Sequence, residues 1–249
     1  IRRRFAIGVE VADRLKRWNG CTAEVLHPPI DVAGLHNQGL GDYFFLPGRL
    51  HRWKRVSLAI EAVRESPLPM RLLIAGTGAE EQALRALAQD DARIQLLGFV
   101  DDSQLKDLYA NALAVPFLPI HEDYGYVTIE AFAAAKPVIT CTDSGETLQF
   151  VEHNVTGLVC EPTPASVRHA MERLWQDREL ARRMGRAGQE RTAHISWPRV
   201  AETLLRSGFG SASAARPRLR VAVLDMQPIT PAVGGGRPPR ARGHGGRPR

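Results

Sequence analysis

Long apolar runs are missing from the 249-residue sequence, although hydrophobic residues make up an ordinary 44% of it. No stretch of about 18 consecutive apolar residues occurs, so the sequence predicts no transmembrane helix. Ile1 is followed by three arginines and only a short apolar segment, which does not fit a secretory signal peptide. We therefore interpret Ile1 as a position within a longer sequence.

Cysteine is also scarce, with only Cys21, Cys141 and Cys160 in the whole chain. None belongs to a C-x-x-C pair, and an odd number of cysteines is typical of a reducing compartment. We interpret them as core thiols rather than as metal or redox groups. The cysteine count therefore favours a cytoplasmic location. The sequence also lacks an Asp-x-Asp motif and a His/Asp cluster with metal-ligand spacing, so we expect no metal site.

Positive charge is concentrated at the C-terminal end of the chain. The formal net charge is +6, but residues 216–249 contain eight arginines and a single acid, Asp225. The part before them carries 25 basic and 26 acidic residues. Because this larger part is nearly neutral, the charge does not indicate a domain that binds nucleic acid specifically.

Short apolar runs alternate with segments whose apolar residues recur every three or four positions. The runs predict strands, and the segments predict helices. Strands are expected at 43–47, 70–75, 93–97, 114–118, 138–141 and 157–160, and helices at 55–65, 80–88, 103–112, 127–135, 165–175 and around 180–187. This alternation predicts an α/β fold, a Rossmann-like parallel sheet with helices on both faces. Ligands of such sheets bind at the carboxyl ends of the strands.

Two glutamates, Glu122 and Glu130, stand eight positions apart in one of these strand–helix connections. Glu122 falls in the loop after a strand and Glu130 in the first turns of the next helix, so we expect both to face one cavity. The amides of Gly125, Tyr126 and Val127 lie where that helix begins and predict an anion site. The alternative for the pair alone is a solvated loop glutamate and a helix-start glutamate.

Two cations precede this element at the mouth of the predicted sheet. Arg49 follows a predicted strand, and Lys54 lies five residues after Arg49, just before a helix. Two such cations suit a diphosphate, although both could equally be solvated loop charges.

The motifs occur in a characteristic order: GRLHRWKRVSLAIEAV, LLIAGTG, IQLLGFV, HEDYGYVTIEAFAAAKPVIT and NVTGLV. Together they resemble the retaining family-4 glycosyltransferases, also called group 1 glycosyl transferases, over residues 40–205. The resemblance implies the C-terminal half of a GT-B fold. It also implies transfer of a sugar, with retention, from a nucleotide diphosphate sugar to a glycan or lipid-linked acceptor, without metal or other cofactor.

The resemblance assigns roles to individual residues. It implies that Arg49 and Lys54 hold the donor diphosphate, that Glu122 contacts the hydroxyls of the transferred sugar, and that Glu130 binds the ribose. Arg49, Lys54 and Glu122 form the implied catalytic set. Further implied donor-binding positions are Tyr124, Gly125, Tyr126 and Val127 beside the sugar and phosphate, and Gly98 and Val100 beside the base. Gly76 and Gly78 are more simply interpreted as tight-turn glycines.

Three departures from the family pattern qualify these implications. Family members have a first Rossmann-like domain that binds the acceptor, whereas only residues 1–35 precede the donor domain at 36–207. We interpret 1–35 as the last strand and helix of an acceptor domain plus the interdomain linker. An inactive donor-binding fragment therefore remains an alternative. Glu146 would be unfavourable beside a diphosphate if it pointed inward, and Lys136 replaces a small residue before Pro137.

Residues 208–249 are interpreted as a small-residue linker followed by a basic tail rich in Gly, Pro and Arg, with disorder expected after Gly234. Part of the tail, RLRVAVLDMQPITPAVGGGR, resembles the opening of another first domain. A truncated tandem arrangement, a reading-frame error, and a basic tail that contacts anionic membrane at the inner face or nucleic acid non-specifically all remain open. A sugar epimerase of the same fold is a further alternative, which the glutamate and Arg/Lys pairs disfavour.

Overall fold

The computed structural model describes residues 3–208. The expected basic tail and its disorder after Gly234 lie outside these residues. None of the helices within 3–208 combines the length and the apolar character needed to cross a membrane.

Two short parallel sheets join into one. Their strands are β3 (Tyr43–Pro47), β4 (Arg71–Ala75), β5 (Ile94–Gly98), β6 (Val115–Pro116), β7 (Val138–Cys141) and β8 (Gly157–Cys160). Within the sheets the order is β3-β4-β5 and β6-β7-β8. A parallel bridge between Phe44 and Ala114 connects β3 to the start of β6, and the Leu113 amide donates to Tyr43 O at 2.8 Å. The combined order β5-β4-β3-β6-β7-β8 is that of a doubly wound fold.

The helices follow the predicted alternation. They are α2 (Val56–Glu65), α3 (Glu81–Ala88), α4 (Asp102–Asn111), α5 (Tyr126–Ala133), α6 (Thr147–Phe150), α7 (Pro164–Gln176), α8 (Arg178–Thr192) and α9 (Trp197–Gly208), with the 3-10 turn η1 at Arg52–Lys54. Asp101 caps α4 through a capping box, and Thr163 caps α7. The short α6 and the final α9 were not among the predicted helices.

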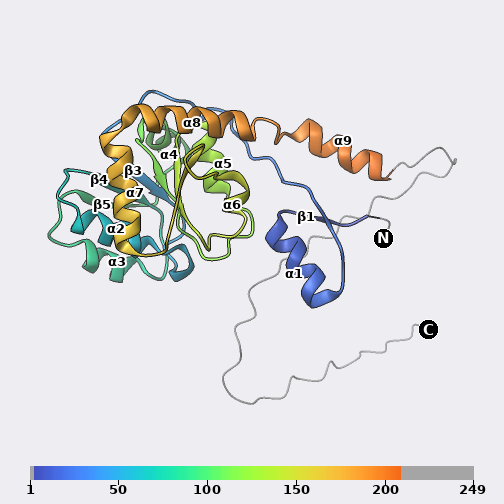
Figure 1. The fold of residues 1–249 in the computed structure, drawn as a ribbon, viewed down its shortest axis with the longest axis horizontal. Helices are drawn as coiled ribbons and strands as arrows, with labels where there is room; N and C mark the ends of the chain where they lie inside the picture. The colour runs from blue at the N-terminus through green and yellow to red at the C-terminus, as the bar shows by residue number, and fades with distance from the viewer. Residues whose placement is uncertain (1–2, 209–249) are drawn as a thin grey trace, which may run out of the picture. The chain divides into compact units, whose positions relative to one another are not determined.

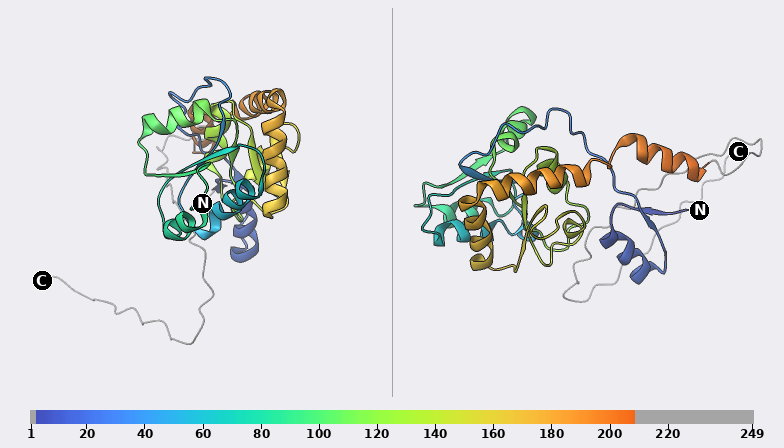
Figure 2. Two further views of the ribbon diagram at one scale, coloured as in Figure 1. Left: turned by 90° about the vertical axis from the view of Figure 1, so that its left-hand side faces the viewer. Right: turned by 45° about the horizontal axis from the view of Figure 1, so that its top comes forward.

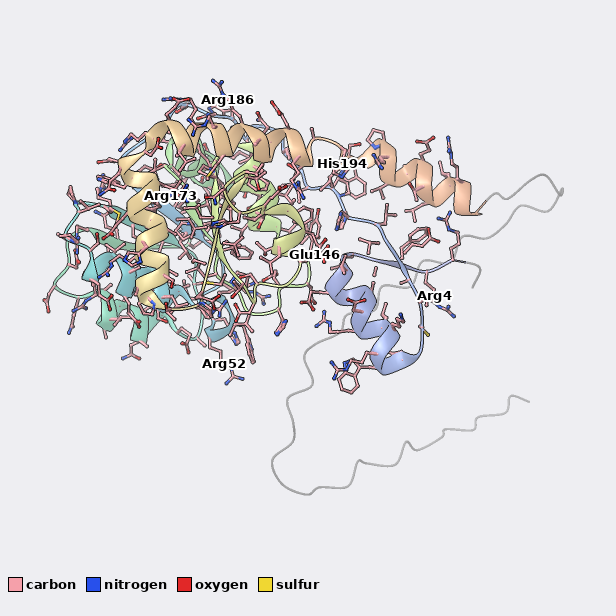
Figure 3. All side chains as sticks on the ribbon, in the orientation of Figure 1. Arg4, Arg52, Glu146, Arg173, Arg186 and His194 are labelled. Atoms are coloured by element: carbon pink, nitrogen blue, oxygen red, sulfur yellow. The ribbon has the colours of Figure 1, made fainter. Side chains whose placement is uncertain are left out.

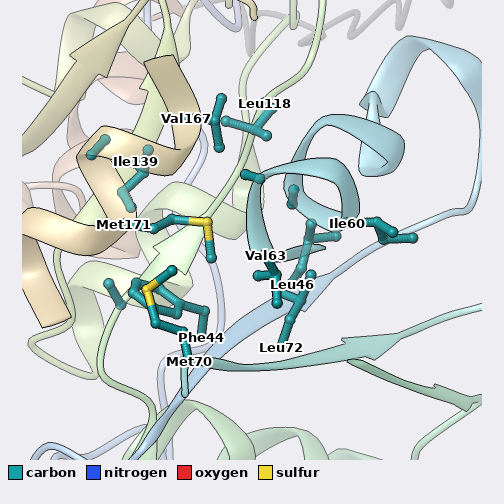
Figure 4. Close-up of a cluster of buried hydrophobic side chains, with 14 of the residues drawn as sticks. Phe44, Leu46, Ile60, Val63, Met70, Leu72, Leu118, Ile139, Val167 and Met171 are labelled. Carbon is teal, nitrogen blue, oxygen red and sulfur yellow. The ribbon is translucent and has the colours of Figure 1, made fainter. Parts of the chain in front are cut away.

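Side chains of β3 alternate between two buried clusters, as the two-residue period of a strand requires. Phe44 and Leu46 pack with apolar residues of α2, α3, α7 and α8 (Figure 4). Tyr43 and Phe45 pack on the opposite face with residues of α4, α5 and α6. On the first face α2 and α7 lie side by side (Figures 1 and 2). The predicted Rossmann-like sheet with helices on both faces is therefore confirmed.

The N-terminal segment forms a small parallel β-α-β unit. β1 (Phe5–Ala6) and β2 (Glu24–Val25) pair in parallel, and α1 (Val9–Asn19) connects them. No side chain of α1 is buried. The strand and helix expected within 1–35 are thus present, while their origin in an acceptor domain stays a prediction.

Lys136 lies in the turn between α5 and β7 and is buried. Its ammonium donates to Asn37 Oδ1 at 2.8 Å and to the Gly39 carbonyl, which ties the segment before β3 to this turn. Burial lowers the pKa of Lys136 to about 8, because removal from water disfavours the charged form. Lys136 therefore occupies the position of a small residue by extending its ammonium to two acceptors, and its burial disfavours the charged form.

This burial predicts a pH-dependent stability. The native state releases the Lys136 proton near pH 8, whereas the pKa of an unfolded lysine has its ordinary value of about 10.5. Between these values the unfolded state binds more protons, so stability should rise with pH, by about 1–2 kcal/mol from pH 8 to 9.5. Urea unfolding at both pH values should show this rise in the parent chain and lose it in Lys136→Met. The exposed Lys16→Met is the control, and an equal slope in Lys136→Met would contradict the assignment.

Candidate functional site

Strands β3 and β6 are neighbours, and the chain leaves them toward opposite faces of the sheet. After β3 it enters α2 on one face, and after β6 it enters α5 on the other. A doubly wound sheet opens a crevice at such a point, outside the carboxyl ends of the strands. The two segments that flank this point carry Arg49 and Lys54 on one side and Glu122 on the other.

The structure brings Lys54 and Glu122 into direct contact. The Lys54 ammonium donates to Glu122 Oε2, and it lies 5.3 Å from the centre of the Phe117 ring. The backbone supports this contact, since the Ile120 amide donates to Trp53 O at 2.9 Å. Both side chains are mostly buried, at 24% and 19% exposed. The sequence placed both residues at one site but did not predict that they pair with each other.

Arg49 differs from Lys54 because its side chain is exposed and forms no ion pair with any described residue. The loop that presents it is held by close backbone contacts. A Cβ at Gly76 would lie 1.9 Å from Gly48 O, and one at Gly78 would lie 2.3 Å from Leu50 O. These two glycines are thus required by close approach to the Arg49 loop, in agreement with their interpretation as turn residues.

Helix α5 begins at an uncapped glycine. Gly125 adopts φ 84° and provides no side-chain cap, so the Tyr126 and Val127 amides have no intrahelical acceptor. The Tyr124 ring is instead buried, and its hydroxyl donates to Pro28 O at 2.5 Å. The predicted anion site at this helix start therefore consists of backbone amides, and the Tyr124 hydroxyl is engaged elsewhere.

Glu130 lies in the second turn of α5, beside a buried tyrosine. The Tyr109 hydroxyl donates to Glu130 Oε2 at 2.7 Å. Burial raises the pKa of Glu130, and the hydrogen bond from Tyr109 opposes this rise. No hydrogen bond among the described residues joins Glu130 to Glu122. The expectation that both glutamates face one cavity stays a prediction.

The predicted base-side residues follow β5. Gly98 adopts φ 71°, and the space where a Cβ would lie is open. Val100 is partly buried against the cluster that includes α4 and α5. The positions of Gly98 and Val100 are compatible with a ligand that extends from the α5 side, and their role stays a prediction.

Glu146 is fully buried, and both of its carboxylate oxygens have partners in the N-terminal segment rather than among the two predicted diphosphate cations. Its Oε1 accepts from His27 Nε2 at 2.7 Å, and its Oε2 accepts from the Glu10 amide at 3.1 Å. Glu146 thus lies beside the beginning of α1 (Figure 3). Together with Glu10, His121 and Asp143 it lines a cavity of about 290 Å³. The repulsion that an inward Glu146 would cause does not arise in this arrangement.

Two residues at the site escaped the sequence analysis. Arg55 and Asp143 form a two-point ion pair although they stand 88 positions apart. The available signal was the third cation in the segment RWKR, directly after Lys54. Nothing local in the sequence marks Asp143 as its partner, because only the sheet order places their loops together.

Residues 37–191 match the family model described as glycosyl transferases group 1. The chain belongs to this family. Human alpha-1,3/1,6-mannosyltransferase ALG2 is 30% identical over 162 residues, which cover 57% of this chain and 39% of that protein. A GDP-mannose-dependent alpha-(1-6)-phosphatidylinositol monomannoside mannosyltransferase of Mycobacterium tuberculosis is 34% identical over 158 residues, covering 59% and 41%. The chain thus spans about two fifths of these relatives.

Solved structures agree on the fold of this group 1 glycosyl transferase domain. Anabaena HepE, crystallised with UDP and glucose, superposes with a TM-score of 0.74 at 17% identity, covering 83% of this chain and 62% of HepE. The C-terminal domain of a group 1 family protein, LpcC of Francisella tularensis, superposes with a TM-score of 0.58 at 18% identity, covering 66% of this chain and 97% of that one. At such identities the likeness concerns the fold.

The buried Glu146 contact predicts a measurable effect on the N-terminal segment. Glu146→Ala removes the acceptor for His27 and for the Glu10 amide, so the free energy of unfolding should fall by about 2 kcal/mol. Limited proteolysis should then cleave faster within residues 9–30. Glu152→Ala is the control, because its ion pair with Arg191 is exposed and should contribute less than about 1 kcal/mol. Equal effects of the two substitutions would contradict the role of Glu146.

Proposed function

We propose that this domain binds a nucleotide diphosphate sugar and forms the donor-binding part of a retaining glycosyltransferase. The acceptor would be a glycan or a lipid-linked sugar. One observation carries the proposal: Lys54 and Glu122 form an ion pair at the point where the strand order reverses, and the free amides of α5 begin four residues after Glu122. Cations and helix amides at such a crevice suit a diphosphate, and a carboxylate suits sugar hydroxyls.

The ion pair of Lys54 with Glu122 suggests how the donor enters. A diphosphate carries more negative charge than a single carboxylate, so it can replace Glu122 as the partner of Lys54. Glu122 is then released to accept hydrogen bonds from hydroxyls of the transferred sugar. The exposed Arg49 requires no such exchange and meets the diphosphate first.

The same groups would assist the transfer step. Cleavage of the sugar–phosphate bond increases negative charge on the diphosphate, which leaves as the nucleoside diphosphate, while the anomeric carbon becomes positive. Arg49, Lys54 and the Tyr126 and Val127 amides would stabilise the leaving group, and one preorganised donor contributes roughly 3–4 kcal/mol in such sites. These charges supply what a divalent metal supplies elsewhere, so the proposal includes no metal or other cofactor.

Two of the similar proteins point to candidate donor nucleotides. The Mycobacterium tuberculosis relative is named as GDP-mannose-dependent, and the Anabaena structure contains UDP and glucose. We propose that Glu130 accepts from the ribose hydroxyls of either nucleotide. Gly98 and Val100 would then lie beside the base.

Binding without transfer is the second candidate function. The observation that favours it is that the described residues before β3 form only β1, α1 and β2, a small segment on which to build an acceptor site. Closure of two domains around the substrate completes the site in many enzymes of this kind. A transfer assay with the chain alone distinguishes the two candidates, since both require donor binding.

The proposal predicts nucleotide binding that depends on Glu130. Calorimetry with UDP-glucose, GDP-mannose and ADP-glucose, without metal, should show micromolar binding of one nucleotide class. Glu130→Ala should weaken that binding at least tenfold, because the ribose loses a charged acceptor. Glu190→Ala, which alters an exposed carboxylate on α8, is the control. Absence of binding by the parent chain would contradict the proposed function.

A second prediction concerns the pH dependence of binding. The acceptor role needs ionised Glu130, so affinity should fall as the pH is lowered through its pKa, which burial raises above the ordinary value of a glutamate. Tyr109→Phe removes the hydrogen bond that lowers this pKa, so the acidic limb should move to higher pH. Dissociation constants from pH 4.5 to 8 test this shift.

The matched control for Tyr109→Phe is Tyr43→Phe. Tyr43 is buried in the same cluster, and its hydroxyl donates to Leu108 O at 2.9 Å rather than to a carboxylate. Its loss should leave the acidic limb unchanged. An equal shift in both variants would mean that general loosening of the cluster, and not the contact with Glu130, determines the pH dependence.

A further inference from the structure

Arg55 adopts an unusual backbone conformation directly after Lys54. Its φ of 48° and ψ of 41° lie in the left-handed region, which costs an L-residue roughly 1–2 kcal/mol. Its side chain is only 13% exposed. A buried arginine with a strained backbone persists only when other contacts compensate for the strain.

The guanidinium of Arg55 makes four hydrogen bonds to two other loops. Nε donates to Leu118 O at 2.7 Å, and Nη2 donates to Pro119 O at 2.7 Å. Nη1 and Nη2 donate to the two carboxylate oxygens of Asp143 at 2.8 and 2.6 Å. The three connected segments follow β3, β6 and β7, so one side chain joins the loops at the carboxyl ends of three strands.

Asp143 and its neighbour extend this network toward Glu122. The His121 amide donates to Asp143 O at 2.9 Å, so the residue before Glu122 is bound to the same loop. Ser144 Oγ donates to Pro119 O at 2.9 Å, a second contact to the carbonyl that Arg55 binds. The positions of Lys54 and Glu122 therefore both depend on groups that Arg55 and Asp143 hold.

Charge balance rules out Arg55 as a third cation for a diphosphate. The hydrogen bonds from Arg55 hold the pKa of Asp143 below its ordinary value, so this carboxylate is charged at neutral pH and neutralises the guanidinium. All of the donors that these contacts use point into the protein. The side chain thus acts on the site through the loops it connects.

We propose that Arg55 is the positioning residue of the donor diphosphate site. It fixes the turn that carries Lys54 relative to the loop that carries Glu122 and leads to the amides of α5. This inference rests on the proposed donor-binding function and assigns a new role within it. Lysine cannot replace arginine here, because a single ammonium cannot donate to four acceptors spread along a planar fork.

The chain contains a matched control at the other end of the sheet. Arg93 precedes β5, and its guanidinium donates twice to Asp91, at 2.9 and 2.7 Å. It also donates to the carbonyls of Ser66 and Leu68 at 2.8 and 2.7 Å. Arg93 therefore makes the same kinds of contacts as Arg55, but at the amino end of a strand, away from the proposed site.

The test compares Arg55→Lys with Arg93→Lys. For each variant, urea unfolding gives stability, and calorimetry gives the affinity for UDP, GDP, UMP and GMP. Both variants should lose similar stability. Arg55→Lys should weaken nucleoside diphosphate binding about tenfold while nucleoside monophosphate binding changes less than twofold, because only the second phosphate depends on the Lys54 turn. Arg93→Lys should change neither.

A second variant distinguishes loss of the guanidinium from misfolding. Arg55→Gly suits the left-handed backbone without strain and still removes the guanidinium, so it should fold and show the same selective loss. Equal weakening of monophosphate and diphosphate binding, or unchanged diphosphate binding, would overturn the positioning role. Failure of the parent chain to bind any of the four nucleotides would instead overturn the donor-binding function on which the role rests.

Discussion

The parallel contact between β3 and the segment that leads into β6 is the constraint on which the site depends. The Phe44–Ala114 bridge makes these strands neighbours although α2, α3 and α4 separate them in sequence. Their chains then diverge to opposite faces, and a doubly wound sheet opens a crevice at such a point. Loops that carry opposite charges, on Lys54 and Glu122, meet there as a direct result of strand order.

Close backbone approach at these strand ends requires residues without side chains. A Cβ at Gly145 would lie 2.6 Å from the Glu122 amide nitrogen, and one at Gly76 would meet Gly48 O. The loops after β3, β4, β6 and β7 are consequently packed against one another rather than free in solvent. Backbone contacts thus hold these loops together, and side-chain networks such as that of Arg55 fix the charged residues on them.

The sheet and most helices could be predicted because their signals are local. Central strands such as Tyr43–Pro47 are buried along their whole length and appear in the sequence as continuous apolar runs. Helix α6 spans only Thr147–Phe150, which is too short to display a helical period. In α9, Pro198 lies in the first turn, where proline is tolerated, and the periodic pattern after it was missed.

The partners of the charged side chains could not be predicted from the sequence. Lys54 and Glu122 are 68 positions apart, and His27 and Glu146 are 119 apart. Residue types and spacing identified which loops meet, but the direction of a long side chain depends on acceptors that other loops supply. Glu146 illustrates this, since the same carboxylate would oppose a diphosphate if it faced Lys54 and instead joins His27 to the α1 start.

The pairing of cations with carboxylates has a consequence for ligand choice. Lys54 is balanced by Glu122 and Arg55 by Asp143, whereas the exposed Arg49 and Arg52 form no ion pair with any described residue. A weak or singly charged anion gains little by displacing Glu122, because it only exchanges one carboxylate-like partner for another. A diphosphate whose attached sugar also offers hydroxyls to the released Glu122 satisfies both members of the pair. The ion pair therefore favours a ligand that carries both groups over one that carries either alone.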